Sequence, residues 1–245
     1  MSLPQPLLPI RGRRMAESVI ERLIALIQQG QLGPGARLPA ERDLARELGV
    51  SRAVVREAIL YLQQAGLVRT RQGSGTYVAD AGGSVGPAAP PAETQQDLVW
   101  LFELRMGIEG EAAALAARRA TPEDRRRLAA ALDRLERDVA AGRLGVEADF
   151  DLHAAVAAAS GNPHLARALA AATDLLLRSV TVSRARSMAV PGRPQLVVEE
   201  HRAICHRIAA GDPDGARKAM RDHLQAALMR LAGSGGEPGD DTRRA

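Results

Sequence analysis

The sequence has very few aromatic residues, a single cysteine and no long apolar run. Phe, Trp and Tyr make up 2% of the 245 residues, which argues against a single-stranded nucleic-acid platform because such surfaces stack bases on rings. One cysteine cannot form an internal disulfide, and this fits a protein of the reducing cytoplasm. No stretch of about eighteen apolar residues occurs, so no membrane-spanning helix is predicted.

Positive charge gathers in the N-terminal third of the chain. Residues 1–80 contain 11 arginines and 7 acidic residues, whereas residues 81–245 contain 22 basic and 22 acidic residues. The formal net charge of +4 therefore lies entirely in the first third. Such an excess suits contact with phosphates, which supply most of the non-specific affinity of proteins for DNA.

The chain divides at residues 80–93, where DAGGSVGPAAPPAE is rich in Gly, Pro and Ala. This composition without periodicity is typical of a linker. Residues 1–13 lack the order of a signal peptide and are expected to form a flexible arm. Residues 14–79 then form one domain, residues 94–231 a second, and residues 232–245, with a Gly-Ser-Gly-Gly run, a disordered tail.

Residues 37–78 have the outline of a winged helix-turn-helix. The apolar spacing predicts a helix over residues 40–48, followed by a turn at Gly49, since glycine accepts positive φ without steric cost. Ser51 can cap the next helix through its hydroxyl. That second helix is expected to continue to about Ala65.

The second helix of this unit has an apolar stripe on one side and arginine on the other. The stripe consists of Val55, Ala58, Ile59 and Leu62. Arg52, Ala53 and Arg56 are left facing outward near the start of the helix, where a recognition helix meets base edges in the major groove. Arginine there can discriminate guanine by roughly 1–3 kcal/mol. A solvated helix face is the alternative for any single arginine.

Two strands are predicted over residues 67–71 and 76–79. They surround the turn Gln72-Gly73-Ser74-Gly75. Glycine at the tip would let this hairpin approach a phosphate or the minor groove closely.

The segment LPAERDLARELGVSRAVVREAILYLQQAGLVRTRQGSGTYV resembles the N-terminal domain of the GntR family of bacterial transcription regulators. The match extends over residues 16–78 and includes a first helix at residues 16–29. The resemblance implies DNA contacts from the arginine after Pro-x-Glu, from two arginines of the recognition helix and from the wing tip. Ala40 stands where the family often has Ser, so a cap worth about 1 kcal/mol is expected to be missing. The candidate DNA-contacting residues are Arg42, Ser51, Arg52, Ala53, Arg56, Gln72 and Gly73.

After the linker the chain is predicted to be helical throughout. The expected helices span residues 94–120, 122–142, 146–160, 164–186, 195–210 and 213–231, with Gly and Pro at the breaks. Gly107 or Gly110 marks a candidate kink or split in the first of them. Thr121 and Asp212 precede prolines, as a cap precedes an N1 proline. The predicted fold class is mainly α: a winged helix-turn-helix followed by an all-α antiparallel helical bundle.

Four residues of the second domain suit a metal site. Asp149 and His153 are four apart and therefore point from one helix face. His201 and His223 lie on the last two helices, which can bring their side chains together when adjacent and antiparallel. One carboxylate and three imidazoles suit a divalent transition metal such as Zn, Ni, Cu or Mn. On spacing alone, surface or capping histidines remain the alternative.

The segments ADFDLHAAVAAASGNPHL and EEHRAICHRIAAGDPDGARKAMRDHL resemble the FCD effector domain of the FadR-like GntR subfamily. The resemblance implies a metal held by an Asp and a His four apart, by a His in Glu-His-x-x-Ile and by a His-Leu near the end. These positions are Asp149, His153, His201 and His223. Zinc is the first expectation for the metal, with nickel or manganese as alternatives.

The first helix after the linker, ELRMGIEGEAAALAARRA, also matches that subfamily and implies an Arg105 that points into the bundle cavity. A buried arginine must be paired or must meet an anion. Glu109, one turn away, and the carboxylate of a bound ligand both remain open as its partner. His164 and His206 do not match the pattern, and Cys205 reads as a small buried apolar side chain.

The sequence therefore predicts a DNA-binding transcription regulator rather than an enzyme. A homodimer would place two recognition helices on a pseudo-palindromic operator. A small organic acid on the metal would control this binding, with repression relieved by the ligand. A regulator that senses the metal itself or uses it structurally remains an alternative, and a metalloenzyme with a zinc-bound water is a more remote one. An acyl-CoA sensor is disfavoured, because the subfamily members of that type lack the metal-ligand set.

Overall fold

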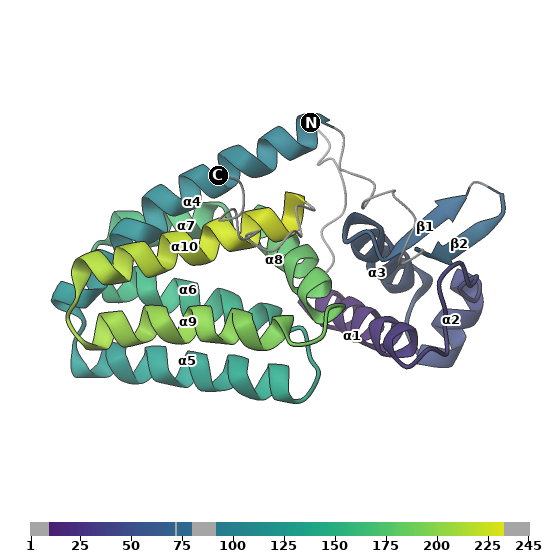
Figure 1. The fold of residues 1–245 in the computed structure, drawn as a ribbon, viewed down its shortest axis with the longest axis horizontal. Helices are drawn as coiled ribbons and strands as arrows, with labels where there is room; N and C mark the ends of the chain where they lie inside the picture. Colours follow the sequence, from purple (N-terminus) through teal and green to yellow (C-terminus); the bar gives the residue numbers. More distant parts are fainter. Residues whose placement is uncertain (1–9, 72, 80–91, 233–245) are drawn as a thin grey trace, which may run out of the picture.

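The computed structural model describes residues 10–71, 73–79 and 92–232 (Figure 1). These residues form ten helices and one two-stranded sheet. The sheet and helices α1 to α3 make a winged helix-turn-helix at one end of the molecule, and the remaining helices make an all-α domain at the other. The predicted fold class is confirmed. Among the described residues, no helix combines the length and the apolar character that crossing a membrane requires.

Helix α1 (Ile10–Gln28) packs its apolar side against the recognition helix. Residues 10–13, expected as part of a flexible arm, belong to this helix, and residues 1–9 lie outside the described residues. Gly12 alone costs only about 1 kcal/mol, which a long amphipathic helix outweighs. The buried stripe of α1 is Ala16, Val19, Ile20, Leu23 and Ile24.

Helices α2 (Glu41–Leu48) and α3 (Arg52–Gln64) form the helix-turn-helix. Gly49 turns the chain with a φ of 65°, in the left-handed region that favours glycine. The Ser51 hydroxyl accepts a hydrogen bond of 3.3 Å from the Val54 N–H, as the sequence predicts. Ala40 provides no side-chain cap for α2, which is also as expected.

Strands β1 (Val68–Arg71) and β2 (Gly75–Val78) pair antiparallel to form the wing. The register runs from the pair of Val68 and Val78 to the pair of Arg71 and Gly75. Arg37 adds an isolated bridge to Tyr77, so the segment that leads into α2 lies along the outer edge of β2. The hairpin is thereby fixed to the body of the domain.

The C-terminal domain is a layered helical bundle. Helix α10 lies along α4, α9 packs between α10 and α5, and α6 contacts both α4 and α5 (Figure 1). Helix α4 runs unsplit through Gly107 and Gly110, and a Cβ at Gly110 would lie 3.1 Å from Nε of Arg221 on α10. The helices are α4 (Ala92–Arg119), α5 (Pro122–Ala140), α6 (Val146–Ala159), α7 (Pro163–Ala171), α8 (Thr173–Met188), α9 (Arg193–Ala209) and α10 (Pro213–Ala232).

Local capping chemistry marks the starts of α5 and α7 in this domain. At the start of α5, the Thr121 hydroxyl accepts from the Asp124 N–H at 3.2 Å, and the Asp124 carboxylate accepts from the Thr121 N–H at 3.0 Å. Asn162 caps α7 by accepting from the His164 N–H at 3.0 Å. These hydrogen bonds satisfy backbone N–H groups that the first turn of a helix leaves unpaired. The sequence therefore indicates both breaks through nearby residues.

The single helix expected over residues 164–186 is wrong, because the structure has two helices there. Helix α7 ends at Ala171, and α8 begins at Thr173. No Gly or Pro marks the break. Helix α7 packs on α4 and α6, whereas α8 reaches α1 and α3 of the other domain. The change of direction therefore comes from tertiary packing rather than from a local breaker.

Helix α8 and the loop before α6 join the two domains. Arg186 donates to the Gln64 carbonyl at 2.7 Å, and the Gln28 amide donates to the Met188 carbonyl at 2.7 Å. The Leu144 N–H donates to the Glu21 carboxylate at 2.7 Å. Backbone groups at the ends of elements are thus paired across the boundary, which gives the domains a defined relative position.

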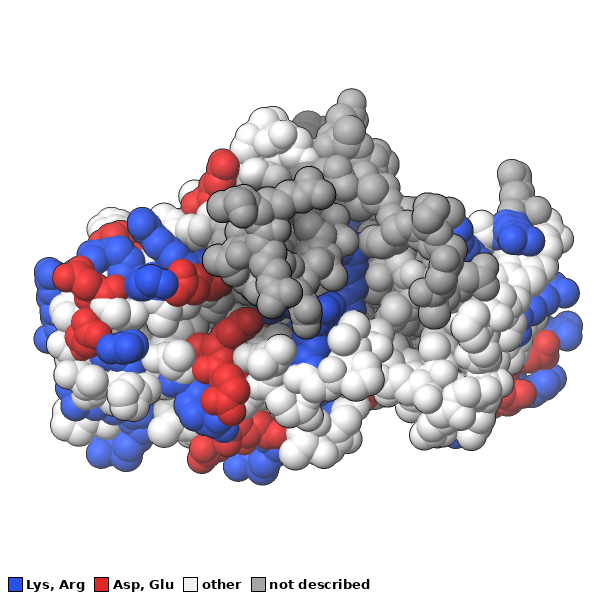
Figure 2. All heavy atoms as spheres, viewed as in Figure 1, with Lys and Arg blue, Asp and Glu red and all other residues white. Residues whose placement is uncertain are grey.

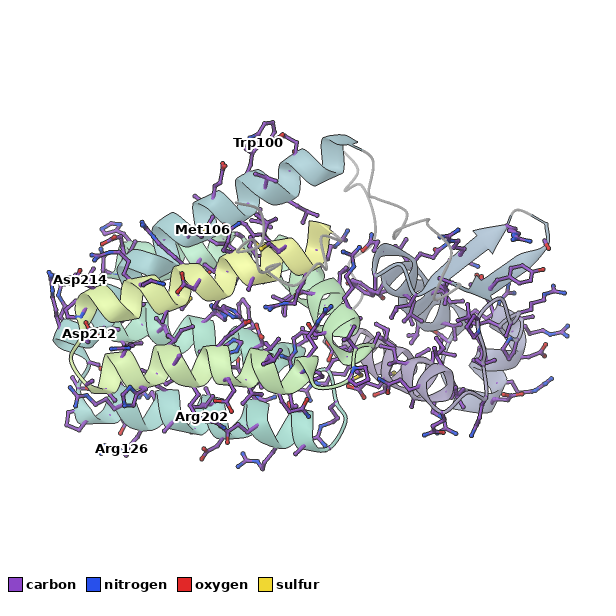
Figure 3. The ribbon with its side chains drawn as sticks, in the orientation of Figure 1. Trp100, Met106, Arg126, Arg202, Asp212 and Asp214 are labelled. Atoms are coloured by element: carbon purple, nitrogen blue, oxygen red, sulfur yellow. The ribbon has the colours of Figure 1, made fainter. Side chains whose placement is uncertain are left out.

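One face of α4 presents large apolar side chains to solvent. Trp100 and Leu104, one turn apart, are 59% and 52% exposed. Figure 3 shows Trp100 pointing away from the bundle. Isolated exposed apolar residues are common, but two on adjacent turns form a small patch.

Candidate metal centre and nucleic-acid interface

The start of α3 presents the predicted DNA-contacting side chains to solvent. Ser51, Arg52, Ala53 and Arg56 are all exposed, while Val54 and Val55 are buried. The fold thus supports the outward face that the sequence predicts. In Figure 2, by contrast, positive and negative side chains are mixed over the helical domain.

Two of the predicted arginines form weak surface ion pairs. The Arg56 guanidinium lies 3.1 Å from the Glu41 carboxylate, and that of Arg42 lies 3.6 Å from Asp43. The two arginine side chains are 66% and 78% exposed, respectively, so these pairs contribute little and can exchange for phosphate. Within the described residues, Arg52 forms no ion pair.

Two arginines at the wing, Arg71 of β1 and Arg37 beside β2, were not singled out from the sequence. The Arg71 guanidinium lies 5.2 Å from the centre of the Tyr77 ring, and the Arg37 side chain fills the place where a Cβ on Gly75 would sit. Gly73 is exposed at the tip with a φ of 73°. Gln72 lies outside the described residues. Arg71 lies in a strand and Arg37 in an extended segment beside it. The alternation of side chains along such segments does not predict which residues these arginines contact.

Three histidines meet inside the helical domain. His153 of α6, His201 of α9 and His223 of α10 each offer one ligand atom, and these atoms all lie within 4.8 Å of one another. All three side chains are buried, with exposures of 3%, 0% and 4%. The structure therefore brings together three of the residues predicted as ligands, from three different helices.

Asp149 completes this group. Its Oδ2 lies 3.4 Å from Nε2 of His201, and its Oδ1 lies 3.8 Å from Nε2 of His153. The carboxylate is itself buried. The one-turn spacing on α6 thus places Asp149 and His153 on a common face toward α9, as the sequence predicts.

Each imidazole is held through its Nδ1 atom by an acceptor. Nδ1 of His153 bonds to the Glu109 carboxylate, Nδ1 of His201 to the Val197 carbonyl at 2.7 Å, and Nδ1 of His223 to the Glu200 carboxylate at 2.8 Å. Carbonyls and carboxylates only accept, so each Nδ1 carries the proton and each Nε2 keeps its lone pair. This is how proteins orient histidines that bind metals.

In two of the three imidazole rings, the Nε2 atom forms no hydrogen bond. Nε2 of His153 and Nε2 of His201 are buried without a hydrogen bond. An unpaired buried nitrogen costs free energy comparable to a lost hydrogen bond. A divalent cation among these atoms would satisfy both, so the residues present fit a metal.

Electrostatics keep this cluster in the form that a metal requires. Burial lowers the pKa of His201 to about 4 and lowers the pKa of His223 as well. Burial by itself raises the pKa of the Asp149 carboxyl, but His201 and His153 outweigh it and bring the pKa to about 2. At neutral pH the group therefore offers the neutral imidazoles of His201 and His223 and the Asp149 carboxylate, which are borderline and hard donors for a metal.

Arg105 pairs with Glu109, one of the two partners left open by the sequence. Its Nε lies 2.6 Å from Oε1 of Glu109, and both side chains are almost fully buried. The other oxygen of Glu109 holds His153, and Arg105 and His153 together keep the pKa of Glu109 well below its usual range although burial opposes them. Through Glu109, Arg105 thus also helps to orient His153, one of the candidate metal-binding residues.

Two small cavities adjoin the cluster and share Arg105, Asp149 and Val180 in their walls. The larger has about 300 Å³ of space between atoms and is lined by Phe102, Arg105, Asp149, Ser179, Val180, Ser183, Arg184, Val197, His223, Ala227 and Arg230. The smaller has about 210 Å³ and extends to His153 and Phe150. For the centre of a water-sized sphere the two cavities leave only about 20 and 10 Å³, room for about one water molecule each, so a larger ligand must push the lining side chains apart.

Sequence reasoning missed the residues that support the cluster from outside. Glu200 accepts from His223 and from Arg230, whose Nη1 and Nη2 lie 2.8 and 3.0 Å from its oxygens. Its only signal is its position directly before His201. Arg184, on α8, also reaches the larger cavity. In the sequence it reads as an ordinary charged helix residue.

The remaining candidates lie away from the cluster. His164 and His206 are exposed, in agreement with their mismatch to the ligand pattern. Cys205 is partly buried, and burial raises the pKa of its thiol to about 12. The thiol therefore stays protonated and is a poor ligand.

Two family models match the chain. The model of bacterial regulatory proteins of the gntR family matches residues 15–78, and the FCD domain model matches residues 100–226. The first match covers the helix-turn-helix and the wing. The second contains all four residues of the histidine and aspartate cluster.

Several known proteins are similar along most of the chain. A protein of Escherichia coli strain K12, named for the regulation of an L-lactate dehydrogenase operon, is 36% identical over 86% of this chain and 84% of its own length. An uncharacterized HTH-type transcriptional regulator of Mycobacterium tuberculosis is 35% identical over 92% of this chain and 93% of its own. The HTH-type transcriptional regulator LutR of Bacillus subtilis is 34% identical over 81% and 93%. Their names describe regulators and not enzymes.

Proposed function

Since the chain belongs to the GntR family of bacterial transcription regulators and carries an FCD domain, we propose that it is a homodimeric repressor controlled by a small organic acid at a metal. The metal is held by Asp149, His153, His201 and His223, with zinc as the expected ion. DNA binding and the regulatory role follow from the family. The bound metal, the organic-acid effector and the homodimer are what we propose beyond the family.

The observation that carries the metal is the arrangement of the imidazoles. Every Nδ1 faces an acceptor, and two Nε2 atoms are buried without a partner beside the Asp149 carboxylate. A divalent ion bound there would supply a Lewis-acid site for a ligand carboxylate or hydroxyl. The chain's own residues then orient the ligand and exclude water from it.

The cavities beside the cluster support a small acid as the effector. The walls of the larger one combine Phe102 and Val180 with Arg105 and Arg184, which can contact an apolar body and an anionic group when the lining side chains move apart to admit a ligand. The E. coli relative is named for an L-lactate dehydrogenase operon. We therefore take short 2-hydroxy acids as the class to test first.

The operator would be read by two copies of α3. A two-fold dimer presents its recognition helices to half-sites about one helical turn, roughly 34 Å, apart. The candidate contacts are Arg42, Ser51, Arg52, Ala53, Arg56, Gln72 and Gly73. The ligand changes operator affinity only through its different affinity for dimer geometries that fit and do not fit this spacing.

The test is a titration of operator binding. Duplexes selected by the full-length protein from a random library serve as the operator, and fluorescence anisotropy reports affinity with zinc alone, with lactate alone and with both. The proposal expects lactate to weaken operator binding only in the zinc-loaded protein. A response to zinc that no 2-hydroxy acid modifies would instead establish a metal sensor.

A pair of variants locates the response in the cluster. His201→Ala removes a buried candidate ligand, while His206→Ala removes an exposed imidazole from the same helix. We expect the first variant to lose zinc and the acid response, and the second to keep both. Equal zinc content in the two variants would remove His201 from the site.

A further inference from the structure

The larger cavity contains a buried arginine that forms no ion pair with any residue the structure describes. Arg184 of α8 is 4% exposed. Its Nε donates to the Leu144 carbonyl at 2.6 Å, but its Nη1 is buried without a hydrogen-bond partner. The same side chain lines the cavity together with Asp149 and His223. Arg184 therefore brings a charged side chain with an unused donor to the wall of the space beside the metal cluster.

Leaving this donor unpaired is costly. A guanidinium stays protonated in proteins, and a buried charge without a hydrogen-bonded partner is strongly unfavourable. Burial lowers the pKa of Arg184, and the Asp149 carboxylate partly opposes this. A ligand oxygen with negative charge would use the free Nη1 in a charge-assisted hydrogen bond.

The other two arginines of the cavity already have carboxylate partners. Arg105 pairs with Glu109, and Arg230 pairs with both oxygens of Glu200. Asp149 is adjacent to His153 and His201, where it belongs to the metal cluster. Arg184 is thus the cavity arginine whose counter-charge must come from elsewhere.

Charge balance indicates how many negative groups the ligand carries. The pairs of Arg105 with Glu109 and of Arg230 with Glu200 cancel. A divalent ion and Arg184 together bring three positive charges, and Asp149 brings one negative charge. A ligand with two negative charges completes the balance, whereas a monocarboxylate leaves one positive charge in a buried site.

The wall around Arg184 is suited to a second polar group. Ser183 precedes it in sequence, Ser179 lies one turn earlier on α8, and both line the same cavity. The Ser179 hydroxyl donates its one proton to the Leu176 carbonyl at 2.9 Å, so the charged donor for a ligand carboxylate on this side of the cavity is Arg184. This side of the cavity is a polar end rather than a pocket for a methyl group.

We propose that Arg184 binds a second carboxylate of the effector, so that the site selects a short 2-hydroxy dicarboxylate over the monocarboxylate of equal length. This inference rests on the proposed acid control. It assigns one end of the effector to the metal and the other to Arg184, while Arg105 acts through Glu109 and His153 as a positioning residue.

Malate and 2-hydroxybutyrate are a matched pair of probes. Both have four carbons and the same 2-hydroxy acid head, and they differ in a carboxylate that replaces a methyl group. Isothermal titration calorimetry on the zinc-loaded full chain is expected to give a Kd for malate at least about tenfold lower than for 2-hydroxybutyrate. Equal affinities would overturn the inference and leave the proposed function standing. If neither acid nor lactate binds, the proposed function itself fails.

Arg184→Gln tests the assigned residue, with Arg178→Gln as a control on an exposed position of the same helix. We expect Arg184→Gln to weaken malate about tenfold or more and to leave 2-hydroxybutyrate within about threefold. The control should change neither. Equal weakening of both acids, or none, would overturn the role of Arg184. If the Arg184→Gln variant does not fold, the affinities of the wild-type chain for malate and 2-hydroxybutyrate still test whether the site prefers a dicarboxylate.

Discussion

Arg186 of the helical domain donates a hydrogen bond of 2.7 Å to the carbonyl of Gln64, the last residue of the recognition helix. The same guanidinium donates to the carbonyls of Arg230, at 2.8 Å, and Leu231 near the end of α10. One buried side chain therefore joins the C-terminal ends of two helices that belong to different domains.

Replacing this side chain should destabilise the protein. Arg186→Gln leaves buried carbonyls unpaired, and we expect the free energy of unfolding to fall by about 2 kcal/mol. Chemical denaturation followed by circular dichroism measures it. Arg178→Gln, on an exposed position of α8, is expected to change stability by less than about 0.5 kcal/mol. Equal stability of the two variants would contradict the structural role of Arg186.

Arg186 should also transmit the ligand signal. The Arg230 side chain pairs with Glu200, which holds His223, while its backbone carbonyl accepts from Arg186. We expect Arg186→Gln to bind zinc and acid as the wild type does, but to show a smaller change in operator affinity when the acid is added. Anisotropy and calorimetry on the same samples separate the two effects. An unaltered response would show that this contact does not carry the signal.

The groups that accept hydrogen bonds from Nδ1 of the three clustered histidines should influence how tightly the site binds zinc. Glu200→Gln removes the charge that faces His223, and such changes next to a ligand typically weaken metal binding by about 10–100-fold. The neighbouring Glu199 is 63% exposed and faces Arg202, so Glu199→Gln is the matched control. Competition with a fluorescent zinc chelator measures both. Identical zinc affinities would argue against His223 as a ligand.

Operator recognition should depend on Arg52. This side chain is exposed at the start of α3, and Arg52→Ala is expected to cost roughly 1–3 kcal/mol of discrimination against altered base pairs. Arg126→Ala, which removes a 70% exposed arginine of α5, should leave operator binding unchanged. Anisotropy with the selected operator and with single-base variants reports the outcome. Full specificity in Arg52→Ala would exclude this docking of the recognition helix.

The metal-free protein should lose stability in mild acid. Burial lowers the pKa of His201 from the usual 6.5 to about 4 in the folded state. Between these values the unfolded chain binds a proton that the folded chain does not, so stability falls as pH decreases, by up to about 1.4 kcal/mol per pH unit. Urea denaturation in chelator from pH 7 to pH 4 measures the slope. His201→Ala should show a shallower slope than the wild type.

Local signals in the sequence predict turns and helix caps in both domains. Gly49, Ser51 and Thr121 act through neighbours within four residues, so the turn and the caps can be recognised without knowledge of the fold. The spacing of Asp149 and His153 likewise fixes a common helix face. The approach of His201 and His223 depended on family resemblance, because long-range helix pairing leaves little trace in a single sequence.

Features set by packing could not be predicted in this way. The break at Ala172 has no local breaker, and the acceptor for His201 is a backbone carbonyl, that of Val197, which every residue possesses. Arg184 and Arg186 are two residues apart in one arginine-rich helix, yet one faces the cavity and the other faces the recognition helix. Only the positions of the neighbouring helices distinguish them.

The exposed indole on α4 gives the protein an optical reporter of its own. Trp100 is the only tryptophan in the chain and is 59% exposed, so intrinsic tryptophan emission comes from one known place. A chain with this face in water emits toward the red and is quenched by iodide, whereas a subunit or ligand that covers the face shifts the emission to the blue and protects it. Assembly at this surface can therefore be followed by fluorescence without any label.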